Sequence, residues 1–297
     1  MFSVVTIIGA LILYIGSLFL IALWVERGSL RAKRLANSPL VYVLALAVYC
    51  TSWTYYGSVG NAASSGMLFL TIYLGPTLMI ALWWLVLRKL VRIKNIHRIT
   101  TIADFISARY ERSAALAAIV TVIALVGIAP YIALQLKSVT STFTTMLATS
   151  DVSGTLGRGT IGLVIVVVMT AFTIIFGARR LDPTERQPGM VVALAVQGIV
   201  KLAAFLAVGI FVTYFMYDGF GDIFQRLSES SFPGLMNRAG EDIPAYFNWI
   251  TYLILSMSAI IFLPRQFHVA VVENLDEKHI RTAMWLLPLY LLLINIF

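Results

Sequence analysis

Charged residues are scarce in this chain, and cysteine and histidine are scarcer still. Only 12% of the 297 residues are charged and 60% are hydrophobic, which excludes the composition of an ordinary soluble domain. The single cysteine, Cys50, excludes a disulfide framework within the chain, and three scattered histidines match no zinc or haem spacing. The sequence also lacks a Walker lysine loop, a nucleophile elbow and a kinase phosphoacceptor or ATP-binding segment. No enzyme is therefore expected within these residues.

Long apolar runs are what the sequence has in abundance. Runs near the roughly 20 residues needed to cross a bilayer recur along the chain, so we predict an all-α polytopic membrane protein. The first run is long enough to span and ends in a basic loop, which favours a retained helix over a cleaved signal. The expected helices are 3–24, 39–66, 67–87, 114–145, 161–176, 190–217, 247–263 and 284–297.

Two of these runs have unusual lengths. The fourth is long enough to be tilted or kinked, with Pro130 as the natural position of a kink. The eighth has only 14 residues, or about 21 Å at 1.5 Å per residue, whereas a span needs roughly 30 Å of apolar length. We therefore expect seven full helices and a truncated eighth, as in the N-terminal part of a longer protein.

The distribution of positive charge predicts an orientation in the membrane. The net charge is +8, and the basic residues of alternate loops number 4, 7, 3 and 3 on one side against 1 and 2 on the other. By the positive-inside rule we expect cytoplasmic basic loops, an outside N-terminus and, in a bacterium, a multi-pass protein of the cytoplasmic (inner) membrane. The charge is then a topology signal and a contact for membrane lipid, and nucleic acid is not an expected partner.

Residues 39–66 begin as a membrane span and do not continue as one. Residues 40–49 are apolar, whereas residues 50–66 mix small, polar and aromatic side chains. Glycine and serine lower helix propensity, and irregular backbone at membrane depth persists only where protein or water satisfies its polar groups. In transporters, such broken helices bind ions and substrates. A tight helix-packing face of small residues explains the same composition equally well.

Several motifs together resemble the sodium/solute symporter family, which includes the proline, sugar and pantothenate symporters. They are Thr51-Ser52-Trp53 with the glycines that follow, the segment 101–110, the segment 130–137, Gly177-Ala178-Arg179-Arg180, and Phe262-Leu263-Pro264. The resemblance covers nearly the whole chain, 1–297, as one domain. It implies an inverted-repeat fold with one extra N-terminal helix, a first repeat in helices two to six, and the start of the second repeat in helices seven and eight.

The resemblance also implies where an ion and a solute would bind. The carbonyl groups of Ala47 and Cys50, with the nearby hydroxyl group of Thr51, correspond to one half of the family's sodium site. The residues expected beside the solute carry hydroxyl, amide or aromatic groups; they are Ser52, Trp53, Tyr56, Gln135, Ser256 and Ser258. Aromatic walls with a few polar groups suit a small polar solute, of which the family suggests an amino acid. For Trp53 and Tyr56, an interfacial belt or core packing is an equally good reading.

The resemblance implies one cofactor, a sodium ion. Two departures from the family concern the residues that would couple this ion to the solute. Proline-type symporters carry an aspartate where Tyr49 stands, and the family's Thr-Asp pair at the start of helix six appears here as Thr184-Glu185. Lys201 lies near the middle of helix six, where insertion of a lysine costs at least ~2.5 kcal/mol. We therefore expect Lys201 to face the bundle with Gln135 or Glu185 as its partner, and we expect Glu185 and Lys201 to take part in ion or proton coupling.

The exit from the seventh helix points to a subgroup. Residues 263–274 and 279–290 resemble the symporter-like domain at the N-terminus of bacterial sensor histidine kinases. That resemblance favours a sensory input module, in which solute binding biases a C-terminal kinase module that acts with a response regulator. A sodium- or proton-coupled symporter is the alternative, a membrane scaffold that transports nothing is a third reading, and sensing and transport are compatible in one domain.

Overall fold

The computed structural model describes residues 4–28, 30–147, 162–164, 166–167, 170, 187–229 and 243–297. Every regular element in these described ranges is a helix. The helices are α1 (Val4–Glu26), α2 (Leu30–Ala36), α3 (Pro39–Leu46), η1 (Ala47–Tyr49), η2 (Trp53–Gly57), α4 (Ser58–Ser65), η3 (Gly66–Leu70), α5 (Thr71–Ala81), α6 (Val86–His97), α7 (Ile102–Ala108), α8 (Ala114–Leu147), α11 (Pro188–Phe211), η4 (Val212–Met216), α12 (Phe220–Glu229), α13 (Ile243–Phe262), α14 (Pro264–Phe267), η6 (His268–Val272) and α15 (Lys278–Leu293). Most of the expected fifth helix and Glu185 lie outside the described residues.

Several of these helices have the length and apolar composition of membrane spans, which indicates a membrane protein. Four described helical segments are long and apolar enough to cross a bilayer: Gly9–Glu26, Trp53–Ala81, Ala114–Met146 and Pro188–Met216. The bent pair Tyr246–Phe262 and Pro264–Val272, with an angle of 47° between its parts, makes a fifth if it is one span. The all-helical prediction is therefore confirmed in the described part of the chain.

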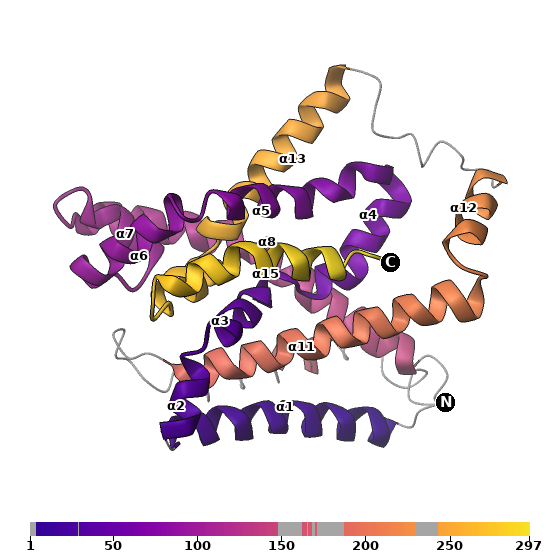
Figure 1. The fold of residues 1–297 in the computed structure, drawn as a ribbon, viewed down its shortest axis with the longest axis horizontal. Coiled ribbons are helices and arrows are strands. Elements are labelled where there is room, and N and C mark those ends of the chain that lie inside the picture. Colours follow the sequence, from indigo (N-terminus) through magenta and orange to yellow (C-terminus); the bar gives the residue numbers. More distant parts are fainter. Residues whose placement is uncertain are drawn as a thin grey trace.

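The short helix α3 lies at the centre of the bundle. It packs against α11, α15 and η6, and α1 covers the other side of α11 (Figure 1). Five of its eight residues are buried, including Tyr42, whose hydroxyl group donates a hydrogen bond to the carbonyl oxygen of Ala270 at 2.8 Å. A helix that is apolar on every side belongs in the interior. The chain therefore buries the segment that leads into the predicted break.

Glycine residues allow close contacts between helices around this core. A Cβ atom at Gly198 of α11 would lie 2.7 Å from the carbonyl oxygen of Leu44 in α3. Likewise, a Cβ atom at Gly75 of α5 would lie 2.8 Å from the carbonyl oxygen of Leu253 in α13. Small residues let the backbones of membrane helices approach closely, so both pairs depend on glycine.

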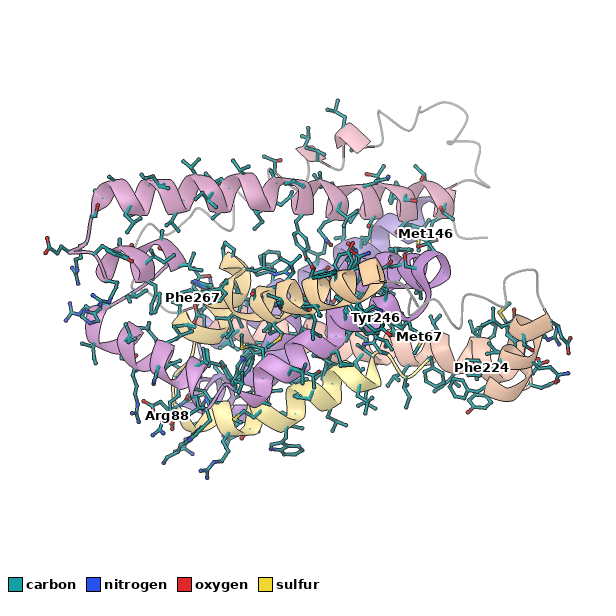
Figure 2. All side chains as sticks on the ribbon, turned by 90° about the horizontal axis from the view of Figure 1, so that it is seen from above. Met67, Arg88, Met146, Phe224, Tyr246 and Phe267 are labelled. Atoms are coloured by element: carbon teal, nitrogen blue, oxygen red, sulfur yellow. The ribbon has the colours of Figure 1, made fainter. Side chains whose placement is uncertain are left out.

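Two expected helices differ from the prediction in continuity. The helix expected at 67–87 is divided, because α5 ends at Ala81 and α6 begins at Val86. By contrast, α8 continues through Pro130 without interruption. It runs along one side of the bundle, with Met146 near its end (Figure 2), and none of its span is buried. Because α8 is one long helix along this side, residues near its middle can contact the interrupted segment at residues 50–52.

The basic segments gather at one end of the molecule. Helices α2, α6 and α7 lie at that end, whereas α12, the start of α1 and the C-terminal end lie toward the other (Figure 1). The arrangement agrees with the division of basic loops used to predict an orientation, and the orientation itself stays a prediction. The motif at 101–110 has a local role here, because Thr101 and Asp104 form a capping box that begins α7.

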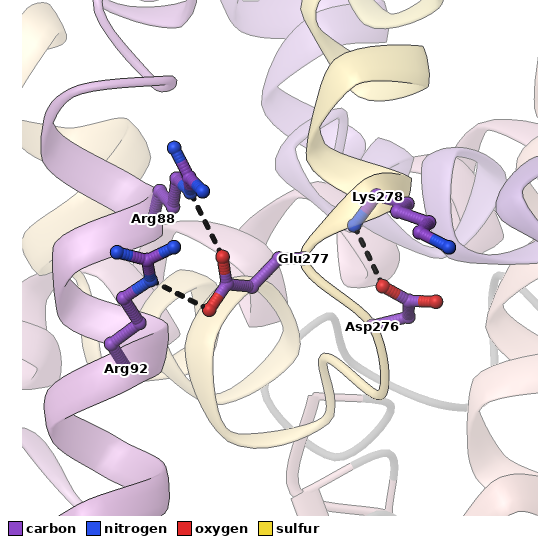
Figure 3. Close-up of polar contacts among 5 residues, drawn as sticks. All are labelled: Arg88, Arg92, Asp276, Glu277 and Lys278. Atoms are coloured by element: carbon purple, nitrogen blue, oxygen red, sulfur yellow. Dashed lines mark hydrogen bonds and ion pairs between the residues drawn. The ribbon is translucent and has the colours of Figure 1, made fainter.

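One carboxylate joins two helices at the basic end. Glu277, just before α15, accepts hydrogen bonds from the Nε atoms of Arg88 and Arg92 of α6, each at 2.8 Å (Figure 3). The nearby Asp276 instead accepts from the backbone N–H of Lys278 at 2.9 Å. Two guanidinium groups on one carboxylate connect the beginning of α15 to α6.

We expect this ion pair to lose its stabilising effect in acid. The hydrogen bonds from Arg92 and Arg88 lower the pKa of Glu277 from 4.5 to about 2. Because the pKa is depressed in the folded state, the stabilisation is present above about pH 4.5 and is lost as the pH falls through about 2. The Tm of detergent-solubilised Glu277→Gln should therefore lie below that of the wild type at neutral pH and approach it in acid. Asp276→Asn is the control, and a constant difference between Glu277→Gln and the wild type across this range would contradict the assignment.

Candidate functional site

The backbone interruption predicted within residues 39–66 is present and begins directly after η1. Cys50 leaves the helical region with φ −78° and ψ 114°, and the chain becomes helical again at Ser52 and η2. A second interruption occurs at Gly66, whose φ of +60° belongs to a conformation that suits glycine. We call the segment Cys50–Ser52 the break. Broken helices in transporters present such free backbone groups to ligands.

Lys201 of α11 occupies the carbonyl end of the break. Its Nζ atom donates a hydrogen bond to the carbonyl oxygen of Cys50 at 2.9 Å. The hydroxyl group of Tyr55 in η2 donates to the carbonyl oxygen of Lys201 at 2.8 Å, so the two sides of the break both contact this residue. A positive charge is favourable at the carboxyl end of a helix. The expected bundle-facing position of Lys201 is confirmed, but its partner is a backbone carbonyl, and Gln135 bonds elsewhere.

Polar side chains of helix α8 contact the hydroxyl groups of Thr51 and Ser52 in the break. Ser52 Oγ donates a hydrogen bond to Oε1 of Gln135, and the hydroxyl group of Tyr131 donates to Thr51 Oγ1 at 3.1 Å. Thr51 Oγ1 also accepts from the backbone N–H of Trp53 at 3.3 Å. The structure therefore brings Thr51, which was predicted at the ion site, close to Ser52 and Gln135, which were predicted beside the solute.

Two residues of this cluster were not among the predicted site residues. Arg265 of α14 donates from Nη2 to the hydroxyl oxygen of Tyr131 at 3.0 Å, and its guanidinium carbon lies 5.3 Å from the centre of that ring. Both residues belong to motifs recognised in the sequence, 130–137 and 263–274. Their polar groups within apolar surroundings were the available signal, but their contact depends on the tertiary fold.

The aromatic residues of η2 lie on different sides of the helix. The Trp53 ring covers Gly57, where a Cβ atom would lie 2.4 Å from the ring. Tyr56 is 53% exposed, and its hydroxyl oxygen accepts from Thr142 Oγ1 of α8 at 2.8 Å. Trp53 is half-buried beside the core, whereas Tyr56 contacts the C-terminal part of α8. The absence of a side chain at Gly57 therefore allows the Trp53 ring to occupy this position.

Ser256 and Ser258 do not join the cluster at the break. Ser256 Oγ donates to the carbonyl oxygen of Thr71 at 2.7 Å in the contact between α13 and α5. Ser258 Oγ donates to the carbonyl oxygen of Ile254 in its own helix, at an exposed position. The expectation that both line the solute site gains no support from these contacts, because each hydroxyl group bonds to a helix backbone.

The residues expected to bind sodium do not fit that ion in this structure. The carbonyl oxygen of Ala47 accepts from the backbone N–H of Cys50 at 3.0 Å, and the Cys50 carbonyl already accepts from the Lys201 ammonium group. A sodium ion on the same carbonyl would be strongly repelled by that ammonium group at low dielectric. We therefore assign no step of the mechanism to sodium.

A cavity among the described residues lies away from the break. Its volume is about 280 Å³, and it lies at the basic end beside Tyr42, Pro188, Glu273 and His279. None of the residues at the break lines it. The groups at the break are bonded to one another, so a solute would have to replace some of those bonds.

Comparison with family models, curated proteins and solved structures finds no match for this chain. The interpretation of its function therefore depends on the chemistry of the residues at the break. In the described part of the chain, the two cationic side chains there, Lys201 and Arg265, form no ion pair with a carboxylate.

Proposed function

We propose that this chain is a symporter-like transmembrane domain that binds a small polar solute and serves as the sensory input module of a bacterial two-component histidine kinase. The observation that carries the proposal is the break itself, with the Lys201 ammonium group on the Cys50 carbonyl and polar groups of α8 on the opposite side. Intramembrane charges and unwound backbone are costly, and both usually mark a functional site.

A solute at the break would act by exchanging hydrogen bonds between elements. The Ser52–Gln135 and Thr51–Tyr131 bonds join the break to α8, and Arg265 joins Tyr131 to the bend after α13. A ligand that replaces these bonds has different affinities for the conformations with α8 attached and released, and it therefore shifts their populations. The bend leads into residues 263–274, the segment whose resemblance suggests a kinase input domain.

Removing Trp53 or Lys201 is expected to abolish solute binding. Trp53→Ala deletes the aromatic wall over Gly57, and Lys201→Ala deletes the cation on the Cys50 carbonyl. Binding is measured by titration calorimetry in detergent with amino acids, starting with L-proline and L-histidine. Lys137→Ala, which removes an exposed lysine of α8, is the matched control. Unchanged binding by both site variants would disprove the site assignment.

The alternative function is a working symporter driven by ions. The observation that favours it is the titratable amine of Lys201 at the position where a coupling ion would bind. Uptake by proteoliposomes that follows a proton gradient, and its loss in Lys201→Ala, would support transport. Binding without uptake would favour a sensor.

A further inference from the structure

We infer that the solute bound at the break carries a carboxylate group, held between Lys201, Arg265 and the side-chain amide of Gln135. The inference rests on the proposed function, because it names the chemical class of the solute at that site. It is carried by the charges and hydrogen-bond donors that meet at the break.

The first argument is charge. Lys201 Nζ bonds to the Cys50 carbonyl, and Arg265 bonds to the Tyr131 hydroxyl, which bonds to Thr51. Two cationic side chains thus reach consecutive residues of one backbone segment through neutral oxygen atoms. Charges within a membrane protein are normally compensated by an opposite charge. An anion at the break would supply that compensation, whereas a cation would add to the repulsion.

The second argument is an excess of donors. Gln135 accepts from Ser52 through Oε1, while its Nε2 atom is buried and, among the described residues, has no hydrogen-bond acceptor. An ammonium group carries three N–H donors and a guanidinium group five, and the contacts above use one of each. A carboxylate offers two oxygens that accept several charge-assisted hydrogen bonds. A carboxylate can therefore accept hydrogen bonds from the N–H donors of Gln135, Lys201 and Arg265 that have no acceptor among the described residues.

The third argument is the state of the carbonyl groups that a sodium ion would need. The Ala47 and Cys50 carbonyls both accept hydrogen bonds, the latter from Lys201. The positive charge at the helix end is therefore supplied by the chain. We expect carboxylate binding to need no sodium and to proceed in potassium buffers.

The test compares acids with their amides. L-Proline, L-histidine and succinate are titrated calorimetrically into the detergent-solubilised full chain in sodium-free potassium buffer. Each acid is compared with the amide in which every carboxylate is replaced, which for succinate is the diamide. We expect at least one acid to bind and its amide to bind at least tenfold more weakly, a difference of about 1.4 kcal/mol. An amide that binds as tightly as its acid would overturn this inference and leave solute binding intact. Absence of binding by every acid and amide would remove the proposed function as well.

Variants separate charge from fold. Lys201→Met and Arg265→Met should each lower the affinity for the acid at least tenfold and leave the weak binding of the amide unchanged. Lys201→Arg retains the charge and should restore acid binding to within a few-fold, which a misfolded protein would not do. Lys137→Met is the exposed control on α8. Wild-type affinity for the acid in both methionine variants would overturn the inference.

Discussion

Alanine at Gly198 is expected to lower the Tm of the protein and to remove solute binding. The new Cβ atom would lie 2.7 Å from the carbonyl oxygen of Leu44 and 3.3 Å from the Cβ atom of Ala47, so α3 and α11 would have to separate. Lys201 follows less than one turn later on α11 and reaches the Cys50 carbonyl across this contact. Because backbone rather than a flexible side chain is in the way, the clash cannot be relieved by a rotamer change.

The matched control for this variant is Gly127→Ala. Gly127 lies within α8, where a Cβ atom would meet nothing within 4 Å, and alanine is favoured over glycine in a helix by about 1 kcal/mol. Its Tm should equal or exceed that of the wild type. If Gly198→Ala also keeps the wild-type Tm and affinity, close approach of α3 and α11 is not required for the site.

Methionine at Lys94 is expected to be the second most damaging change. Lys94 is only 6% exposed, and its Nζ atom donates to the carbonyl oxygens of Val272 at 3.2 Å and Asn274 at 3.1 Å. Methionine fills the space of the lysine stem but leaves both carbonyls without this donor, at about 1–3 kcal/mol for the buried carbonyl group of Asn274. Helix α6 would then lose the hydrogen bonds of Lys94 that connect it to the end of η6.

Lys89→Met provides the comparison, because Lys89 is exposed on the same helix. Chemical denaturation in mixed micelles, followed by helical circular dichroism, gives the free energy of unfolding for both variants. Lys94→Met should be clearly destabilised and Lys89→Met close to the wild type. Equal stabilities would show that the carbonyls of Val272 and Asn274 find other donors.

Composition and local pattern predicted the features of the fold that depend on nearby residues. The change from an apolar run to small and polar residues at Cys50 indicated the break, and a lysine inside an apolar helix indicated that Lys201 faces the bundle. Both follow from the cost of placing polar groups in lipid. That cost does not identify which polar group compensates them, so the Cys50 carbonyl was not predicted as the partner of Lys201.

The remaining features depend on helix rotation and on contacts between distant segments. Ser256 and Ser258 are two residues apart on α13 and point to different surroundings, one into the contact with α5 and one outward. The sequence does not fix that rotation. In the same way, Arg265 and Tyr131 are 134 residues apart, and their contact exists because the bend after α13 brings α14 to α8.

The single cysteine of the chain lies within the break, 1% exposed and bonded through its carbonyl group to Lys201. Any thiol-directed fluorophore or spin label applied to these 297 residues therefore reports from the proposed solute site without engineering of the sequence. Its rate of attachment measures how often the Cys50 thiol becomes accessible. The unmodified chain thus carries its own probe for motion at the break.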